Sequence, residues 1–147
     1  MNPNQVFVLA NNVMIVVWLL LLISLWMPRL RRWAFGAGHW IMPVPLGIAY
    51  CVYLIPAMLD SSGSFSSLES VAELFADNRL LLAGWLHYLA FDLFVGTWIV
   101  RTALDERLPR LWTAVCLPLT FLAGPLGLLL FVVSRAAATA RRGKAET

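Results

Sequence analysis

One apolar run constrains this chain more than any other feature. It extends from Leu80 to Val100, is bounded by Arg79 and Arg101, and carries Asp92 close to its centre. A helix of that length extends about 31 Å, close to the thickness of a bilayer's hydrocarbon core. A carboxylate at that depth costs roughly 2.5–3.5 kcal/mol unless it is protonated, paired or hydrated. The run therefore predicts a membrane-spanning helix that also carries a polar group with a function.

The rest of the chain has the composition of a membrane protein. It is 61% apolar and only 13% charged, whereas soluble domains are nearer half apolar and a quarter charged. Further apolar runs predict an all-α membrane protein, a four-helix transmembrane bundle formed as one domain over residues 1–147. The four spans are expected at about residues 6–27, 40–59, 80–100 and 111–133, followed by a flexible tail at 134–147.

The segments between the spans differ in character. Residues 28–39 carry three arginines and predict a connection. In residues 60–78, Ser66 and Glu69 have capping-box spacing, which predicts a short amphipathic helix between the second and third spans. It would be a structural connector or a lid over the bundle mouth. Residues 124–127 (Gly-Pro-Leu-Gly) predict a bend in the fourth span. Four crossings place both termini on one side, and the Lys/Arg distribution favours the outside.

No metal or cofactor site is predicted. Cys51 and Cys116 fall within spans and are interpreted as buried apolar residues. His39 is the only histidine besides His87, and no metal-ligand spacing occurs. Haem held by His87, alone or with His39, is the alternative. No basic patch with interleaved aromatic residues indicates nucleic acid.

His87 and Asp92 are the candidate acid-base groups. Residues five apart on a helix are separated by about 140°, so the two cannot form a local dyad. They either border one cavity from two sides, or one faces a cavity while the other bonds to a neighbouring helix. Asp92 is interpreted either as a helix–helix link or as a functional acid, because an apolar environment favours the protonated carboxyl. His87 is either a structural hydrogen-bonding group or a general base.

Aromatic side chains surround these two groups in the predicted helices. They would suit a flat conjugated ligand, and tyrosine adds a hydroxyl. His87 shares its helical face with Gly84, Phe91, Phe94 and Trp98, while Tyr88 lies one turn before Asp92. The candidate substrate-binding residues are Trp85, Tyr88, Phe91, Phe94, Trp98, Tyr50 and Tyr53.

The segment from Gly84 to Gly96, followed by Arg101 and later by residues 124–129, resembles a known pattern. It is similar to the small integral-membrane family named after plant abscisic-acid deficiency, the neoxanthin synthase-like family. The most specific part is W-x-H-x-L-A-x-D-L-F. The resemblance implies catalytic roles for His87, Asp92 and Arg101, supported by Trp85 and Gly124-Pro125.

The resemblance implies acid-base isomerisation of a carotenoid or other isoprenoid polyene, with Asp92 as proton donor and His87 as base. The alternative is a non-catalytic membrane binding or assembly protein whose midplane polar residues specify helix pairing. The expected partners are membrane lipid and an apolar polyene, with a homo-oligomer possible. The start of the chain is neither Ser- nor Arg-rich, so a bacterial inner membrane is expected.

Overall fold

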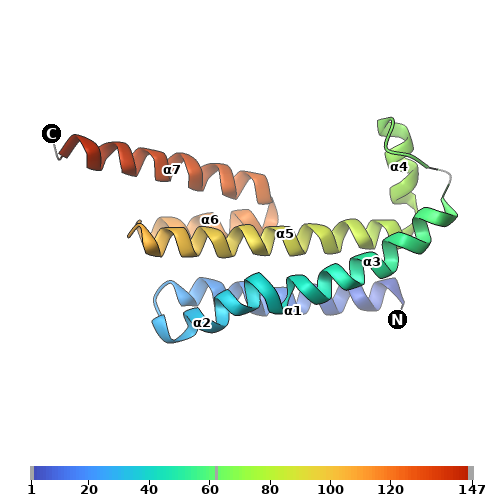
Figure 1. Ribbon diagram of the computed structural model, residues 1–147, viewed down its shortest axis with the longest axis horizontal. Coiled ribbons are helices and arrows are strands. Elements are labelled where there is room, and N and C mark those ends of the chain that lie inside the picture. Colours follow the sequence, from blue (N-terminus) through green and yellow to red (C-terminus); the bar gives the residue numbers. More distant parts are fainter. Residues whose placement is uncertain (1, 62, 146–147) are drawn as a thin grey trace.

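The computed structural model describes residues 2–61 and 63–145, and the regular elements in them are all helices (Figure 1). They are α1 (Pro3–Ser24), α2 (Pro28–Gly36), the π-helical η1 (Ala37–Ile41), α3 (Pro43–Asp60), α4 (Leu68–Ala76), α5 (Asn78–Asp105), α6 (Arg110–Leu122) and α7 (Gly124–Ala145). Among these residues, α1, the stretch Pro28–Asp60 and α5 are long and apolar enough to cross a membrane. The predicted all-α class is confirmed.

Helix α5 is the centre of the fold. Its buried residues recur every three or four positions, as in Leu82, Leu86, Leu89 and Leu93, and they pack into one core with α1, α3 and α6. Glycine lets α1 approach closely, because a Cβ on Gly96 would lie 2.5 Å from the ring of Trp18. Cys116 on α6 belongs to the buried core, as predicted. Cys51 does not, because it lies on an exposed face of α3.

Residues 28–39, predicted as a connection, are helical instead. Pro28 starts α2, and Ala34 is fully buried because α2 packs back against α1. The helix then widens in η1, where the N–H of Met42 donates to the carbonyl of Ala37. Pro43 has no N–H to continue the ordinary helical pattern, which accounts for this local change. The result is a nearly continuous helix from Pro28 to Asp60.

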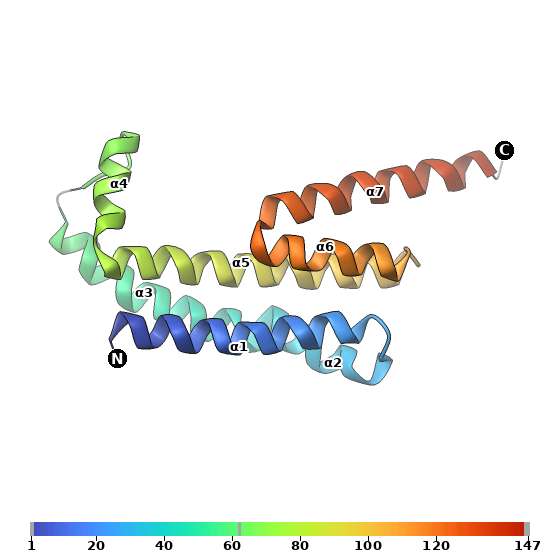
Figure 2. The same ribbon diagram turned by 180° about the vertical axis from the view of Figure 1, so that it is seen from behind.

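Residues 111–133 do not form the single span predicted for them. Helix α6 runs beside α5 to about its middle, and α7 then turns back toward the end from which α6 came (Figures 1 and 2). Ala123 is the only residue between the two helices. The helices pack tightly because a Cβ on Gly127 would lie 2.6 Å from the Cα of Thr120. We call α6 and α7 together the hairpin.

The hairpin changes the positions of the termini. They lie at opposite ends of the molecule rather than on one side (Figure 1). The tail predicted to be flexible continues α7 as helix through Ala145, and residues 146 and 147 lie outside the described residues. Arg135 on α7 forms an ion pair with Glu106 at the end of α5, which raises the pKa of the arginine. This contact fixes the returning helix to the end of α5.

The short helix predicted between the second and third spans is present as α4. Its N-cap is Ser67, whose hydroxyl accepts a hydrogen bond from the N–H of Ser70 at 3.2 Å. The cap is one residue later than the spacing of Ser66 and Glu69 predicts. Leu74 is the buried residue of α4 and packs with Ala57 of α3 and Leu80 of α5. Helix α4 therefore covers the end of the α3–α5 pair.

Candidate functional site

An apolar groove lies between α3 and α5. Its cavity volume is about 350 Å³. Helix α3 contributes four residues and α5 contributes five, and they are Pro43, Leu46, Gly47, Tyr50, Leu86, His87, Ala90, Phe91 and Phe94. Phe91 is 61% exposed and Phe94 is 49% exposed, so these rings border the open side of the groove. We call this cavity the α3–α5 groove.

A second cavity continues from the first toward α4. It measures about 270 Å³ and is enclosed by α3, α4 and α5 together with Phe65. Tyr50 and His87 line both cavities, so they form the junction between them. A Cβ on Gly84 would lie 2.7 Å from the ring of Phe75, which shows how closely α4 approaches α5 here. We call this cavity the α4 chamber. Together the two cavities follow α5 from Leu80 to Phe94, about 21 Å along the helix axis.

His87 is held at the junction by aromatic contacts. Its ring stacks on Phe91 with centroids 4.4 Å apart, one helical turn along α5. The ring of Tyr50 approaches from α3, with centroids 5.8 Å apart. The side chain is exposed at the protein surface. The imidazole therefore borders both cavities and is open to the surface.

Asp92 lies on another side of α5, against the tip of the hairpin. A Cβ on Gly124 would overlap its carboxyl group, so the carboxyl packs directly on the first residue of α7. The Oδ2 atom is buried and has no hydrogen-bond partner among the described residues. Asp92 is not among the residues that line the α3–α5 groove or the α4 chamber. The structure therefore places the two candidate acid-base groups in separate environments.

Three more of the predicted residues contact neighbouring helices. The hydroxyl of Tyr88 donates to the carbonyl of Phe121 at 2.7 Å, linking α5 to the last turn of α6. The indole of Trp85 donates to the Asn11 side chain of α1 at 3.2 Å. Trp98 meets the ring of Phe131 on α7 edge to face, with centroids 5.5 Å apart.

The two remaining predicted residues also lie away from the groove lining. Tyr53 is partly buried against the main core. Arg101 is exposed near the C-terminal end of α5, about 13 Å along the helix axis from Asp92. Of the ten predicted residues, the groove therefore brings together Tyr50, His87, Phe91 and Phe94.

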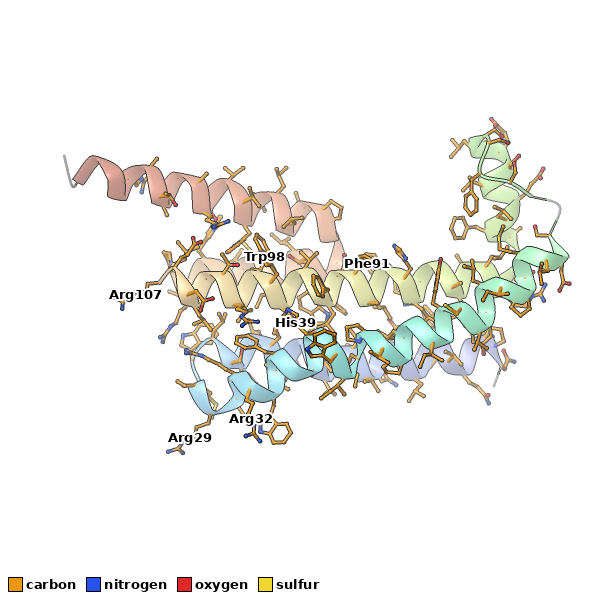
Figure 3. All side chains as sticks on the ribbon, viewed as in Figure 1. Arg29, Arg32, His39, Phe91, Trp98 and Arg107 are labelled. Carbon is orange, nitrogen blue, oxygen red and sulfur yellow. The ribbon has the colours of Figure 1, made fainter. Side chains whose placement is uncertain are left out.

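The second histidine contacts Phe94, which lines the groove. His39 belongs to η1, and its ring meets Phe94 edge to face with centroids 5.1 Å apart (Figure 3). His87 contacts Phe91 and Tyr50 instead, so the two imidazoles stand against different rings. No group of three or more His, Cys, Asp or Glu side chains gathers in the part of the chain that the structure describes.

Sequence reasoning identified Tyr50 but missed the other residues on the α3 side of the groove. Pro43, Leu46 and Gly47 line it, but in the sequence they are ordinary residues of an apolar run. One signal was available, since Gly47 lies one turn before Tyr50 on the same helical edge. A Cβ on Gly47 would meet nothing within 4 Å, so this glycine leaves open space in the groove.

The sequence model of the ABA4-like proteins, described as ABA DEFICIENT 4-like, matches residues 5–131. The chain belongs to the ABA4-like family. The match includes the groove, the hairpin tip and all ten predicted site residues, and it ends before the basic half of α7. Comparison with curated proteins and with solved structures gave no match. Membership of the ABA4-like family implies involvement in the carotenoid and abscisic acid pathway.

Proposed function

We propose that this ABA4-like protein is a membrane-embedded enzyme that isomerises a carotenoid or related polyene bound between α3 and α5. The observation that carries the proposal is the position of His87. It is a titratable group at the junction of two apolar cavities that open along a helix pair. Membership of the ABA4-like family supports the proposed class of ligand.

The shape and chemistry of the groove support a linear apolar ligand. The lining is almost wholly aliphatic and aromatic, and the rings of Phe91 and Phe94 border its open side. Aromatic faces suit a conjugated chain because they offer a large contact area without a requirement for hydrogen bonds. A ligand dissolved in the bilayer can enter such a groove sideways, without crossing water.

The proposed chemistry needs one proton removed from carbon and one proton given to oxygen. In the opening of an epoxide to an unsaturated alcohol, the two transfers balance, so substrate and product are isomers. The His87 imidazole is the proposed base, since neutral imidazole accepts a proton near neutral pH. The Tyr50 hydroxyl, from the facing helix, is the proposed donor to the ligand oxygen.

Asp92 has a different proposed role. Its carboxyl packs against Gly124 at the hairpin tip, outside the groove lining. The mechanism in which Asp92 delivers the proton to the same substrate therefore has less support than one that uses Tyr50. We propose that Asp92 holds the tip of the hairpin against α5. That is the helix-pairing role considered in the alternative hypothesis, applied to one residue rather than to the whole protein.

The test compares His87→Gln with Asp92→Asn in purified protein supplied with a carotenoid epoxide. Removal of a general base costs about 10²–10⁴-fold in rate, so His87→Gln should lose turnover while it still binds the polyene and unfolds at the wild-type temperature. Asp92→Asn should instead lower the unfolding temperature. Chromatography of the extracted pigments measures turnover. Full activity in His87→Gln would refute the proposal.

A non-catalytic binding protein is the second candidate. The exposed rings of Phe91 and Phe94 favour this candidate, because they could hold a polyene without changing the polyene chemically. In that case, wild-type protein and His87→Gln would both bind the pigment, and neither would alter its chromatogram. The absorption spectrum of the purified protein separates this outcome from a failure to bind.

A further inference from the structure

The two ends of the molecule differ strongly in charge. Ten of the eleven Lys and Arg residues fall within residues 29–32, 101–110 and 135–144. These segments gather at one end, because the hairpin brings α7 back toward the α1–α2 turn and the end of α5 (Figures 1 and 3). The opposite end carries Asp60, Glu69, Glu73 and Asp77 together with the remaining basic residue, Arg79. We call the first of these the basic end.

Two arginines of the basic end are used inside the protein. Arg31 donates from Nε to the carbonyl of Ser24 at 3.2 Å, and Arg135 pairs with Glu106. Four others are exposed, and the ion pairs among the described residues do not involve them. These are Arg29, Arg32, Arg101 and Arg110. They come from three different helices and are available to an external anion.

Tryptophans accompany these arginines. Trp26, Trp33 and Trp112 are exposed at the same end, in the α1–α2 turn, in α2 and in the first turn of α6. The guanidinium of Arg32 lies 5.0 Å from the ring centroid of Trp33. Exposed tryptophan beside arginine, at the end of apolar helices, is typical of the headgroup layer of a membrane. An acidic soluble partner would account for the charges but not for the indoles.

We propose that the basic end docks onto anionic phospholipid headgroups, with the first turn of α2 at the level of the headgroup layer. Cationic segments at the ends of spans are attracted to a leaflet that carries anionic lipid. The two termini then lie on opposite sides of the membrane, with the C-terminus on the anionic side. The α4 end, rich in carboxylates, lies at the other surface, where it avoids like-charge repulsion from the anionic leaflet. This inference does not depend on the proposed enzyme function.

The test measures lipid retention by the full chain. Protein is purified from micelles that contain equal amounts of phosphatidylglycerol and phosphatidylcholine, and native mass spectrometry counts the lipid bound to each molecule. Wild-type protein should retain phosphatidylglycerol preferentially. In the variant Arg29→Gln/Arg32→Gln/Arg110→Gln, the ratio of bound phosphatidylglycerol to phosphatidylcholine should fall by up to roughly a hundredfold. Arg79→Gln is the matched control, since it removes one arginine at the other end, and it should keep the preference.

Several outcomes would overturn the inference. One is equal retention of the two lipids by wild-type protein, and another is an unchanged preference in the triple variant. Stronger capture of an RNA or an acidic peptide than of phosphatidylglycerol would point to a different partner. If the triple variant fails to fold, Arg29→Gln and Arg110→Gln alone should each show a smaller loss. Single variants that keep the full preference would count against the proposal.

Discussion

The two sides of α5 differ in how closely the neighbouring helices approach. Toward α3 the helix presents His87 among rings that border an open groove, and a glycine on the facing helix leaves space unfilled. Toward the hairpin it presents Asp92 and Tyr88, which meet the backbone of Gly124 and Phe121 at close range. A cavity that is open on one side can exchange a ligand, whereas close backbone contact maintains a shape.

This comparison teaches that two polar residues of one membrane helix can lie in very different surroundings, His87 at a cavity and Asp92 against backbone. Both His87 and Asp92 are costly in a bilayer, and both therefore suggest function in the sequence. The residues around each of them are what distinguish His87 from Asp92. Substitutions on the groove side should change ligand binding, and substitutions on the hairpin side should change stability. The following predictions test that division, from the largest expected effect to the smallest.

Gly124→Phe should have the largest effect. Even a Cβ at this position overlaps the Asp92 carboxyl, so a ring would force the hairpin tip away from α5. Overpacking of this kind costs about 3 kcal/mol, and the unfolding midpoint in detergent should fall clearly. The unfolding midpoint of Gly124→Ala should fall by less than that of Gly124→Phe. A wild-type midpoint in Gly124→Phe would show that the hairpin is not packed against Asp92.

Gly47→Phe is the counterpart on the groove side. Nothing lies within 4 Å of a Cβ at Gly47, so the ring can occupy the groove without displacing neighbours. Polyene binding should weaken by about tenfold or more, since filling the site removes the ligand's contacts. The unfolding midpoint should stay close to wild type. Binding is followed by titration of the visible absorption band, and unchanged affinity would place the ligand elsewhere.

Tyr88→Phe should have a moderate effect on stability alone. The substitution removes the hydrogen bond to the Phe121 carbonyl and leaves that group without its donor. The expected loss in the free energy of unfolding is about 1 kcal/mol. Pigment binding and turnover should be retained. If Tyr88→Phe keeps its stability but no longer binds pigment, Tyr88 contacts the ligand. The division between a groove side and a hairpin side of α5 would then be wrong for this residue.

The smallest predicted effect concerns pH, at the α4 end. Hydrogen bonds from Arg79 lower the pKa of Asp77 below its usual 3.8, and Arg79 also pairs with Asp60. The resulting stabilisation is fully present above the usual pKa and is lost as pH falls through the lowered folded-state value. The wild-type unfolding midpoint should therefore drop more between about pH 5 and pH 3 than that of Asp77→Asn. If the unfolding midpoints of the two proteins drop equally, the Asp77–Arg79 ion pair does not contribute to stability in this pH range.

The sequence predicted the features that depend on local pattern. The apolar run from Leu80 to Val100 lies within α5. Of the predicted face, Gly84, His87, Phe91 and Phe94 line the cavities, whereas Trp98 packs on Phe131 of α7. The short helix after the serine-rich segment also follows from local capping chemistry. Helical periodicity determines which residues share a face, so these predictions needed no knowledge of the neighbouring helices.

The hairpin could not be predicted in this way. Gly124 and Pro125 indicate a bend, but a hydropathy pattern does not say whether a helix continues across the membrane or returns. The return depends on the contact between Gly124 and Asp92, two residues far apart in sequence. Helix α2 was missed for a similar reason. Its arginines suggest a loop, whereas burial of Ala34 against α1 makes it a helix.

The hairpin has a consequence for how the protein is made. Helix α6 extends only about 20 Å and α7 carries arginines in its second half, so neither resembles a segment that a translocation channel would release alone into lipid. The three long helices can enter the bilayer in the order of synthesis, and the hairpin then finishes the protein by docking onto α5. Until the hairpin docks, the Asp92 carboxyl lacks the contact with Gly124 that buries it in the folded chain.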